Sequence, residues 1–76
     1  MVYRLTERYC GAWHDIVEGG ETFDYETEQE IRSTLDSVGW QTGHGYAMNY
    51  REVTDEQLEE ERRHYANVMT ATMMGE

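Results

Sequence analysis

Apolar and polar side chains alternate along residues 2–9 and again along residues 46–53. In the first stretch, Tyr3, Leu5 and Tyr9 fall on one face of an extended chain. A period of two residues is typical of a half-buried β-strand, because successive side chains of a strand point to opposite faces. We therefore predict a strand over each stretch.

Two further β-rich runs, residues 12–18 and 21–25, flank the pair Gly19-Gly20. Glycine reaches the positive φ angles of a two-residue hairpin turn at little energetic cost. The spacing predicts that these two runs pair with each other as a hairpin. Residues 10–11 are interpreted as a break after the first strand.

The next segment has the start and stop signals of a helix. Thr27, followed by Glu30 three residues later, forms a capping box. Gly39 and Trp40 are typical of a Schellman ending in which Trp40 contacts Leu35. Between these signals, four side chains share one stripe at helical spacing: Ile31, Thr34, Leu35 and Val38. We predict a short helix with this stripe on one face.

A second capping box, Thr54 with Gln57, predicts a helix that begins at Asp55 and runs to about Thr72. Its inward stripe has helical spacing and comprises Leu58, Tyr65, Ala66, Met69 and Met73. Its outer face is charged and comprises Glu56, Glu59, Glu60 and Arg63.

The predicted order of elements is strand, strand, strand, helix, strand, helix. A helix with one apolar stripe must bury that stripe against a neighbouring element. We therefore expect one α+β domain over residues 1–76, with a small antiparallel sheet and both helices packed on one of its faces.

Charge adds a second constraint. The 76 residues include 16 acidic and six basic side chains, all six of them arginine, which gives a formal net charge of −10. Phosphate contacts require clustered lysine or arginine, so we exclude direct binding to nucleic acid. An anionic membrane surface would repel the chain. The aromatic content of 12% is typical of a folded domain rather than of an acidic disordered chain.

The chain has one cysteine, Cys10, and no stretch of about 18 apolar residues. Small secreted domains usually carry several cysteines, so we expect a cytoplasmic protein. Cys10 and three dispersed histidines are too scattered for a zinc site. We expect no metal ion, no cofactor and no enzymatic activity, and we expect Cys10 to be a small buried apolar residue.

The carboxylates are segregated along the chain. All but Glu7 and Glu76 lie in residues 15–36 or 52–61, and Arg32 is the one cation inside these blocks. A salt-tolerant surface would spread its acids over all exposed positions, so segregation favours an acidic binding face. Acids also occur at every second position of one run: 24, 26, 28 and 30. Where that run is extended, its charges repeat about every 6.8 Å, close to two phosphate steps of DNA.

We interpret the acidic face as a docking site for a basic surface on a protein that binds nucleic acid. By occupying a groove that holds phosphate, such a face would inhibit its partner. The expected contact set combines acidic side chains with aromatic anchors: Glu18, Glu21, Asp24, Tyr25, Glu26, Glu28, Glu56, Glu59, Glu60 and Trp13.

In size and charge alone, the chain resembles the small acidic inhibitors that phages and mobile elements direct against host nucleases, including nucleic-acid mimics and anti-CRISPR proteins. The resemblance implies an inhibitor that acts in the host cytoplasm if a phage encodes it, and it carries over no residue role. The alternative is a small structural or regulatory protein whose acidic surface confers only solubility or salt tolerance. Its interface would then be formed by the surplus aromatic and methionine side chains, which leaves a homodimer open.

Overall fold

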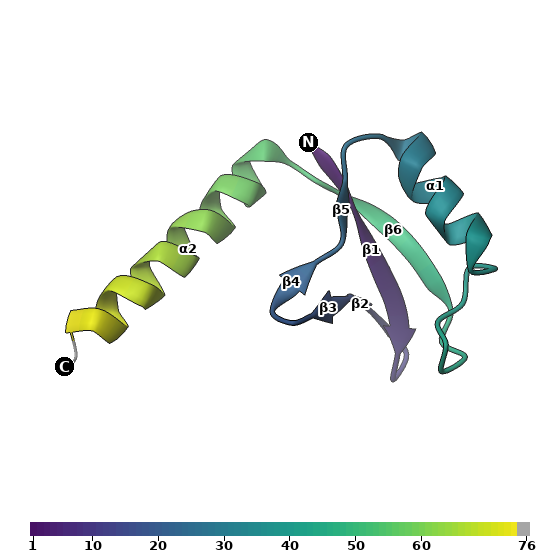
Figure 1. Cartoon of the computed structure of the whole chain (residues 1–76), viewed down its shortest axis with the longest axis horizontal. Coiled ribbons are helices and arrows are strands. Elements are labelled where there is room, and N and C mark those ends of the chain that lie inside the picture. The colour runs from purple at the N-terminus through teal and green to yellow at the C-terminus, as the bar shows by residue number, and fades with distance from the viewer. Residues whose placement is uncertain (75–76) are drawn as a thin grey trace.

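The computed structural model describes the backbone of residues 1–74 and the side chains of residues 1–64. Its elements are, in chain order, β1 (Val2–Tyr9), β2 (Ala12–Asp15), β3 (Val17–Glu18), β4 (Glu21–Thr22), β5 (Asp24–Tyr25), α1 (Glu28–Ser37), β6 (Met48–Val53) and α2 (Asp55–Met74) (Figure 1). This arrangement confirms the predicted α+β class, with a small antiparallel sheet and two helices.

β1 is the central strand of the sheet. β6 pairs antiparallel with residues 2–7 of β1, whereas β2 and β5 pair antiparallel with residues 6–9 and 3–4. Because these pairings overlap along β1, β6 occupies one edge of β1 while β2 and β5 share the other. β5 and β6 therefore both end beside the start of β1. The helices that follow them, α1 and α2, begin at that same end of the sheet (Figure 1).

β2 and β5 lie end to end along the same edge of β1, and a hairpin separates them in the chain. Ile16 donates its backbone N–H to the Leu5 carbonyl at 3.1 Å, and Leu5 donates its own N–H to the Phe23 carbonyl at 3.0 Å. Between these two bonds the chain leaves the sheet, and β3 pairs with β4 across Gly19 and Gly20, whose φ angles are 62° and 82°. The predicted turn is confirmed, but only two residues on each side of it pair.

Residues 12–15 form β2 because Cys10 and Gly11 turn the chain back along β1 instead of breaking it. Both turn residues have positive φ, 53° and 79°, as a two-residue primed turn requires. The eight-residue β1 offers residues 12–15 a longer partner than the run 21–25 does. The expected hairpin between residues 12–18 and 21–25 is therefore wrong for residues 12–15, which pair with β1 instead.

α1 begins and ends as predicted. The Thr27 hydroxyl oxygen accepts a hydrogen bond from the Glu30 N–H at 3.2 Å and caps the first turn. At the other end, Gly39 has a φ of 65°, and the Trp40 N–H donates to the Leu35 carbonyl at 2.9 Å. That last bond is the one that defines a Schellman motif. Both helix boundaries therefore depend on groups that are near neighbours in the sequence.

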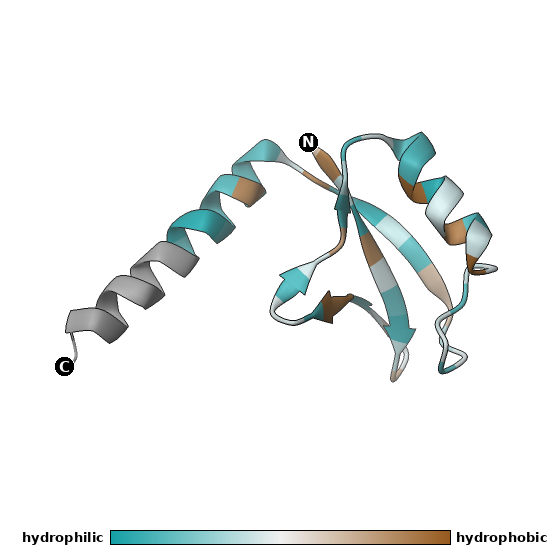
Figure 2. Ribbon diagram, viewed as in Figure 1, coloured by the Kyte–Doolittle hydropathy of each residue, from teal (hydrophilic) through white to brown (hydrophobic). Residues whose placement is uncertain are grey.

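The apolar core lies between α1 and one face of the sheet. Leu5 of β1 and Ile31 and Leu35 of α1 are buried in one cluster. Partly buried side chains surround this cluster: Tyr3, Ile16, Phe23, Tyr25, Trp40, Met48 and Tyr50. Figure 2 shows hydrophobic segments on α1 and in the middle of β1. Since only a few side chains form its centre, each one contributes a large share of the buried apolar surface.

α2 does not share this face. It begins with the predicted capping box, in which the Thr54 hydroxyl oxygen accepts a hydrogen bond from the Gln57 N–H at 3.2 Å, and then runs away from the sheet (Figure 1). We expected both helices to pack on one face of the sheet. α1 packs on that face, but α2 does not. The reason lies in residues 55–64, where Leu58 is the one apolar side chain and is half-buried. The rest of its expected stripe lies outside the described side chains: Tyr65, Ala66, Met69 and Met73.

Replacing Leu35 with alanine should lower the free energy of unfolding by about 2–5 kcal/mol, because the substitution leaves a cavity at the centre of the core. Val38→Ala, at the end of the same helix where the side chain is 48% exposed, should change it by no more than about 0.5 kcal/mol. Urea unfolding followed by circular dichroism measures both values. Equal losses for the two variants would contradict this placement of the core.

Candidate functional site

The face of β1 opposite to the apolar core carries a buried arginine. Side chains alternate along a strand, so Arg4 lies on the other face from Leu5, and it is only 3% exposed. Its guanidinium donates to Asp24 from Nε at 2.7 Å and from Nη2 at 3.1 Å. It also donates to Glu61 from Nη1 and Nη2, both at 2.9 Å. Bidentate arginine–carboxylate pairs of this kind combine charge attraction with strict geometry.

A second arginine, Arg51 of β6, lies directly opposite Arg4 in the register of the sheet. It binds Asp15 in the same bidentate manner, with two N–O distances of 2.8 Å. Asp15 also accepts a longer hydrogen bond from Arg4 Nη1 at 3.4 Å. Its negative carboxylate therefore lies between two positively charged guanidinium groups. We name five side chains the ion-pair cluster: Arg4, Arg51, Asp15, Asp24 and Glu61. The cluster joins β1, β2, β5, β6 and α2.

The hydrogen bonds of the ion-pair cluster favour the ionised forms of Asp15, Glu61 and the two arginines. Hydrogen bonds from Arg51, and to a lesser extent from Arg4, lower the pKa of the Asp15 carboxyl although burial opposes this effect. Hydrogen bonding to Arg4 lowers the pKa of Glu61, and Glu61 and Asp24 in turn raise the pKa of Arg4. A group that transfers protons in catalysis needs a pKa near the working pH. The cluster therefore fixes elements relative to one another and is not arranged for proton transfer.

Asp24 and Tyr25, two members of the expected contact set, take part in the fold itself. Asp24 is held by Arg4, and Tyr25 packs against the apolar core. β5 is only two residues long, because Thr27 caps α1 directly after it. The acids at alternate positions 24, 26, 28 and 30 therefore do not form the extended row that their spacing suggests.

Glu18 and Glu21 lie directly opposite each other across the β3–β4 turn. Both are exposed, and neither forms an ion pair with any residue that the structure describes. Like charges in opposed strand positions destabilise a sheet. The tip of this hairpin thus presents two carboxylates whose mutual repulsion is not relieved within the described part of the chain.

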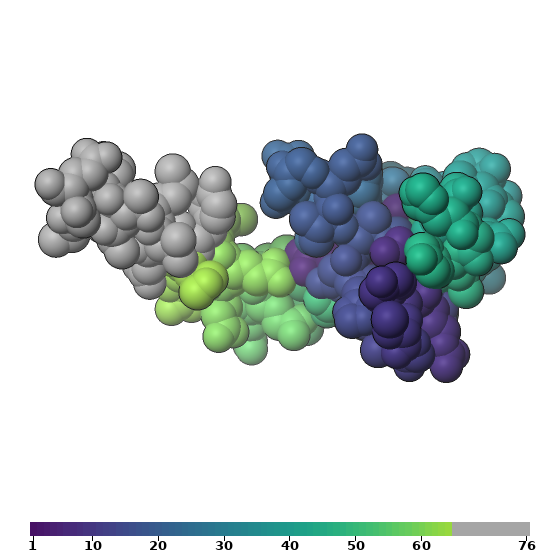
Figure 3. All heavy atoms as spheres, turned by 90° about the horizontal axis from the view of Figure 1, so that it is seen from below, coloured from purple at the N-terminus to yellow at the C-terminus, as the bar shows by residue number. Residues whose placement is uncertain are grey.

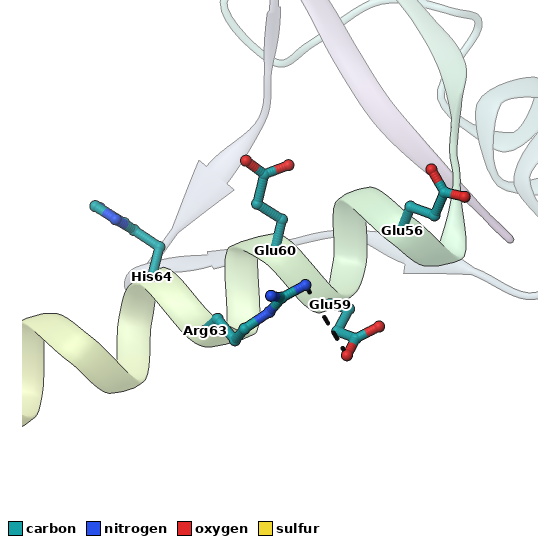
Figure 4. A pocket seen from close by; sticks show the side chains of 5 residues that line it. All are labelled: Glu56, Glu59, Glu60, Arg63 and His64. Atoms are coloured by element: carbon teal, nitrogen blue, oxygen red, sulfur yellow. Dashed lines mark ion pairs between the residues drawn. The ribbon is translucent and has the colours of Figure 1, made fainter.

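Three members of the contact set, Glu56, Glu59 and Glu60, line a shallow groove on α2 together with Arg63 and His64 (Figure 4). Glu56 and Glu60 extend to the same side of the helix, whereas Glu59 pairs with Arg63 at 4.0 Å. All five lining residues come from α2. The groove presents charge to solvent, and no other described element forms an opposite wall that would exclude water.

The two acidic blocks, distant in the sequence, meet at one end of the sheet. Tyr3 pairs with Tyr25 on one side and with Glu52 on the other. Glu52 is therefore two strand spacings, or about 10 Å, from Tyr25, which directly precedes Glu26. The starts of α1 and α2 add further acids at this end (Figure 1). We name five residues the carboxylate-rich end: Glu26, Glu28, Glu52, Asp55 and Glu56.

The carboxylate-rich end is largely unneutralised. Glu26, Glu52 and Glu56 form no ion pair with any of the described residues. Glu28 is 3.6 Å from an arginine one turn later in α1, and Asp55 pairs with the amino group of the N-terminus. Glu52 was not in the expected contact set, and it becomes a candidate only once the pairing of β6 with β1 is known.

Trp13, the other expected anchor, lies at the opposite end of the sheet. It pairs in register with Arg8, which is five residues, or about 17 Å, along β1 from Tyr3. Trp13 is 46% exposed, and its ring centroid is 6.0 Å from the guanidinium carbon of Arg8. The expected contact set is therefore divided between two surfaces.

Cys10 is exposed, contrary to the expectation of a small buried residue, because it occupies the turn between β1 and β2. Among the residues that the structure describes, no group of three or more Cys, His, Asp or Glu side chains is placed to hold a metal ion. None of the described helices is long and apolar enough to cross a membrane. Comparison with protein-family models, curated proteins and solved structures finds no match to this chain.

The ion-pair cluster makes stability depend on pH. The carboxyls of Asp15 and Glu61 have native pKa values below the ordinary values of about 4. Their contribution to stability is therefore complete above about pH 5 and is lost as the pH falls through the lowered native values. We expect the urea concentration at the midpoint of unfolding to fall steeply as the pH decreases below about 5.

Asp15→Asn tests the source of this dependence. The variant should be less stable at neutral pH by about 1–3 kcal/mol, because Arg51 loses its charged partner, and its stability should depend less on acidic pH. Glu18→Gln is the matched control, since it removes one exposed carboxylate that has no ion pair among the described residues. If both variants kept the pH dependence of the original protein, the cluster would not be its source.

Proposed function

We propose that this protein is a small acidic binding protein whose carboxylate-rich end docks on a basic surface of a protein that binds nucleic acid. The observation that carries the proposal is the meeting of two separate acidic blocks at one end of the sheet, beside the starts of both helices. In the proposed complex, these carboxylates occupy positions that phosphates would otherwise take in a lysine- and arginine-lined groove. The protein would then act as a competitive inhibitor of nucleic-acid binding.

The internal use of arginine supports this proposal. Arg4 and Arg51 are bound to Asp15, Asp24 and Glu61, so neither arginine is available to neutralise the carboxylate-rich end. With a net charge of −10, the chain carries a long-range negative field that attracts basic partners and increases the rate of encounter. The same field repels free nucleic acid, which is consistent with a partner that is itself a protein.

Two further groups of acids extend the proposed contact surface. Glu60 lies one turn after Glu56 on the same side of α2, so the negative surface continues along this helix (Figure 4). Glu18 and Glu21 oppose each other at the hairpin tip, and a cation supplied by a partner would relieve their repulsion. In both places, basic side chains of a partner would satisfy charges that the described residues leave unpaired.

The small size and acidic charge resemble those of inhibitors that phages and mobile elements direct against host nucleases. We therefore propose a nucleic-acid-binding protein of a host defence system as the partner, and the host cytoplasm as the place where the two meet. The docking role requires no cofactor and no catalytic group of its own.

The test uses the immobilised chain to capture proteins from a host lysate at about 0.1 M and at about 1 M salt, where the Debye length falls from about 10 to about 3 Å. We expect capture of a nucleic-acid-binding protein at the lower salt only, and its release by added duplex DNA. Mass spectrometry identifies the captured protein.

Two double variants with equal charge changes localise the contact. Glu52→Gln with Glu56→Gln should abolish the capture, because both changes fall in the carboxylate-rich end. Glu7→Gln with Asp36→Asn removes as much charge from other positions of the chain and should leave the capture intact. Equal capture by the two double variants, or capture that persists at about 1 M salt, would overturn the proposal in favour of an apolar interface.

A further inference from the structure

We propose that a pocket on the face of the sheet that carries Arg4 binds an uncharged planar heterocycle with two adjacent hydrogen-bond acceptors, such as a guanine base. The pocket has a volume of about 220 Å³ and is lined by Thr6, Trp13, Asp15, Asn49, Tyr50 and Arg51. We name it the Arg51 pocket. The inference does not depend on what the carboxylate-rich end binds.

The Arg51 pocket is a hollow above one short side chain. Thr6 of the central strand pairs with Asp15 on one side and with Asn49 on the other, so all three share a face of the sheet. The longer side chains of Trp13 and Arg51, from β2 and β6, border the hollow. Figure 3 shows the green atoms of α2 to one side of the purple and blue atoms of β1 and β2. The described part of α2 therefore leaves this half of the face uncovered.

Thr6 has a hydroxyl group that the chain does not use. The residue is only 4% exposed, yet its hydroxyl forms no hydrogen bond with any described residue. Among the described side chains, no oxygen or nitrogen atom is both fully buried and unpaired, so the Thr6 oxygen retains contact with the pocket. Its hydrogen-bond partner must come from outside the chain, as water or as a polar atom of a bound molecule.

Arg51 has one unused edge of its guanidinium, which a comparison with Arg4 makes clear. In Arg4, Nε and Nη2 bind Asp24, while Nη1 and Nη2 bind Glu61, both at 2.9 Å. Arg51 repeats the first arrangement, because its Nε and Nη2 bind Asp15. Its Nη1 donates to no described residue, and its side chain is 40% exposed. The edge formed by Nη1 and Nη2 of Arg51 thus offers two parallel N–H donors to a pair of adjacent acceptors.

Charge favours an uncharged ligand over a carboxylate or a phosphate. Asp15 already neutralises Arg51, and the net charge of −10 repels further anions. An uncharged molecule avoids this repulsion but must still present two acceptors side by side. O6 and N7 of guanine meet this requirement, and they are the atoms that arginine contacts most often in specific base recognition.

Trp13 provides a surface for a flat ring. It is 46% exposed and lines the pocket. It lies two residues before Asp15 in β2, on the same face and about 7 Å along the strand, so its ring is near the guanidinium that Asp15 binds. Bases stack favourably on aromatic side chains. A volume of about 220 Å³ equals the share of about seven water molecules, which is room for a two-ring heterocycle with its sugar outside.

Titration of the full chain with nucleosides, followed by nuclear magnetic resonance, tests the proposal. Guanosine should shift the side-chain N–H signals of Arg51 and Trp13. The indole signal of Trp40, which donates to Asp36 at 2.7 Å, should not move. 7-Deazaguanosine carries a C–H group in place of N7 and should bind at least about fivefold more weakly, because Arg51 loses one of two acceptors. Adenosine, which has an amino donor in place of O6, should bind at least about tenfold more weakly.

Matched variants locate the site. Trp13→Ala should weaken guanosine binding at least about fivefold, whereas Tyr46→Ala, which removes an exposed ring outside the pocket, should leave it unchanged. Thr6→Val keeps the shape of the side chain and should weaken binding about three- to tenfold. It should not lower the free energy of unfolding, because no hydrogen bond to a described residue is lost. Circular dichroism checks that each variant folds.

Arg51→Lys tests the role of the guanidinium. Lysine lacks the planar fork, so this variant should bind guanosine and 7-deazaguanosine equally weakly.

Three results would overturn the proposal. The first is the absence of any shift with guanosine, and the second is equal binding of guanosine and 7-deazaguanosine by the original chain. The third is tighter binding of benzoate or of guanosine monophosphate than of guanosine, which would assign the pocket to an anion instead.

Discussion

The bidentate binding of carboxylates by one buried guanidinium, that of Arg4, determines how the rest of the chain is arranged. This group holds Asp24 and Glu61, which lie 20 and 57 residues away along the chain. Breaking a buried ion pair by removing one partner costs several kcal/mol. Arg4 can therefore be buried only when β5 and α2 are both in place. The ion-pair cluster makes the positions of these elements depend on one another and on Arg51 of β6.

Because side chains alternate along β1, this one strand supports two kinds of packing. Leu5 contacts α1 through apolar surface, together with Ile31 and Leu35, while the neighbouring Arg4 contacts α2 through the carboxylate of Glu61. α1 has an apolar stripe to bury, whereas the first ten residues of α2 have almost none. The two helices are therefore associated with opposite faces of the sheet, and α1 is the helix that contributes to the apolar core among the described side chains.

The directions of the strands give the molecule two unlike ends. β5 and β6 both run opposite to β1, so the acid-bearing starts of α1 and α2 are placed together at one end. The β1–β2 turn and the loop before β6 are placed at the other end, and the residues that form them include no carboxylate. The proposed docking site is thus a consequence of the directions of the strands.

Features that depend on near neighbours could be predicted from the sequence. Thr27 caps α1 and Gly39 ends it through bonds to nearby groups, and Gly19 and Gly20 form their turn because glycine tolerates positive φ. The acidic character of the surface was equally readable from composition. No local signal showed that Cys10 and Gly11 form a turn instead of a break, because cysteine rarely adopts a positive φ.

The pairing of distant segments was decided by the tertiary structure alone. Asp15 and Asp24 read as members of one acidic run, yet the β3–β4 hairpin between them brings both to the same edge of β1, where Arg4 and Arg51 bind them. The sequence by itself determined the elements, their caps and the sign of the surface charge. Which carboxylates neutralise the arginines and which remain at the surface depends on strand order, because ion pairs form between groups that are close in space however far apart they lie along the chain.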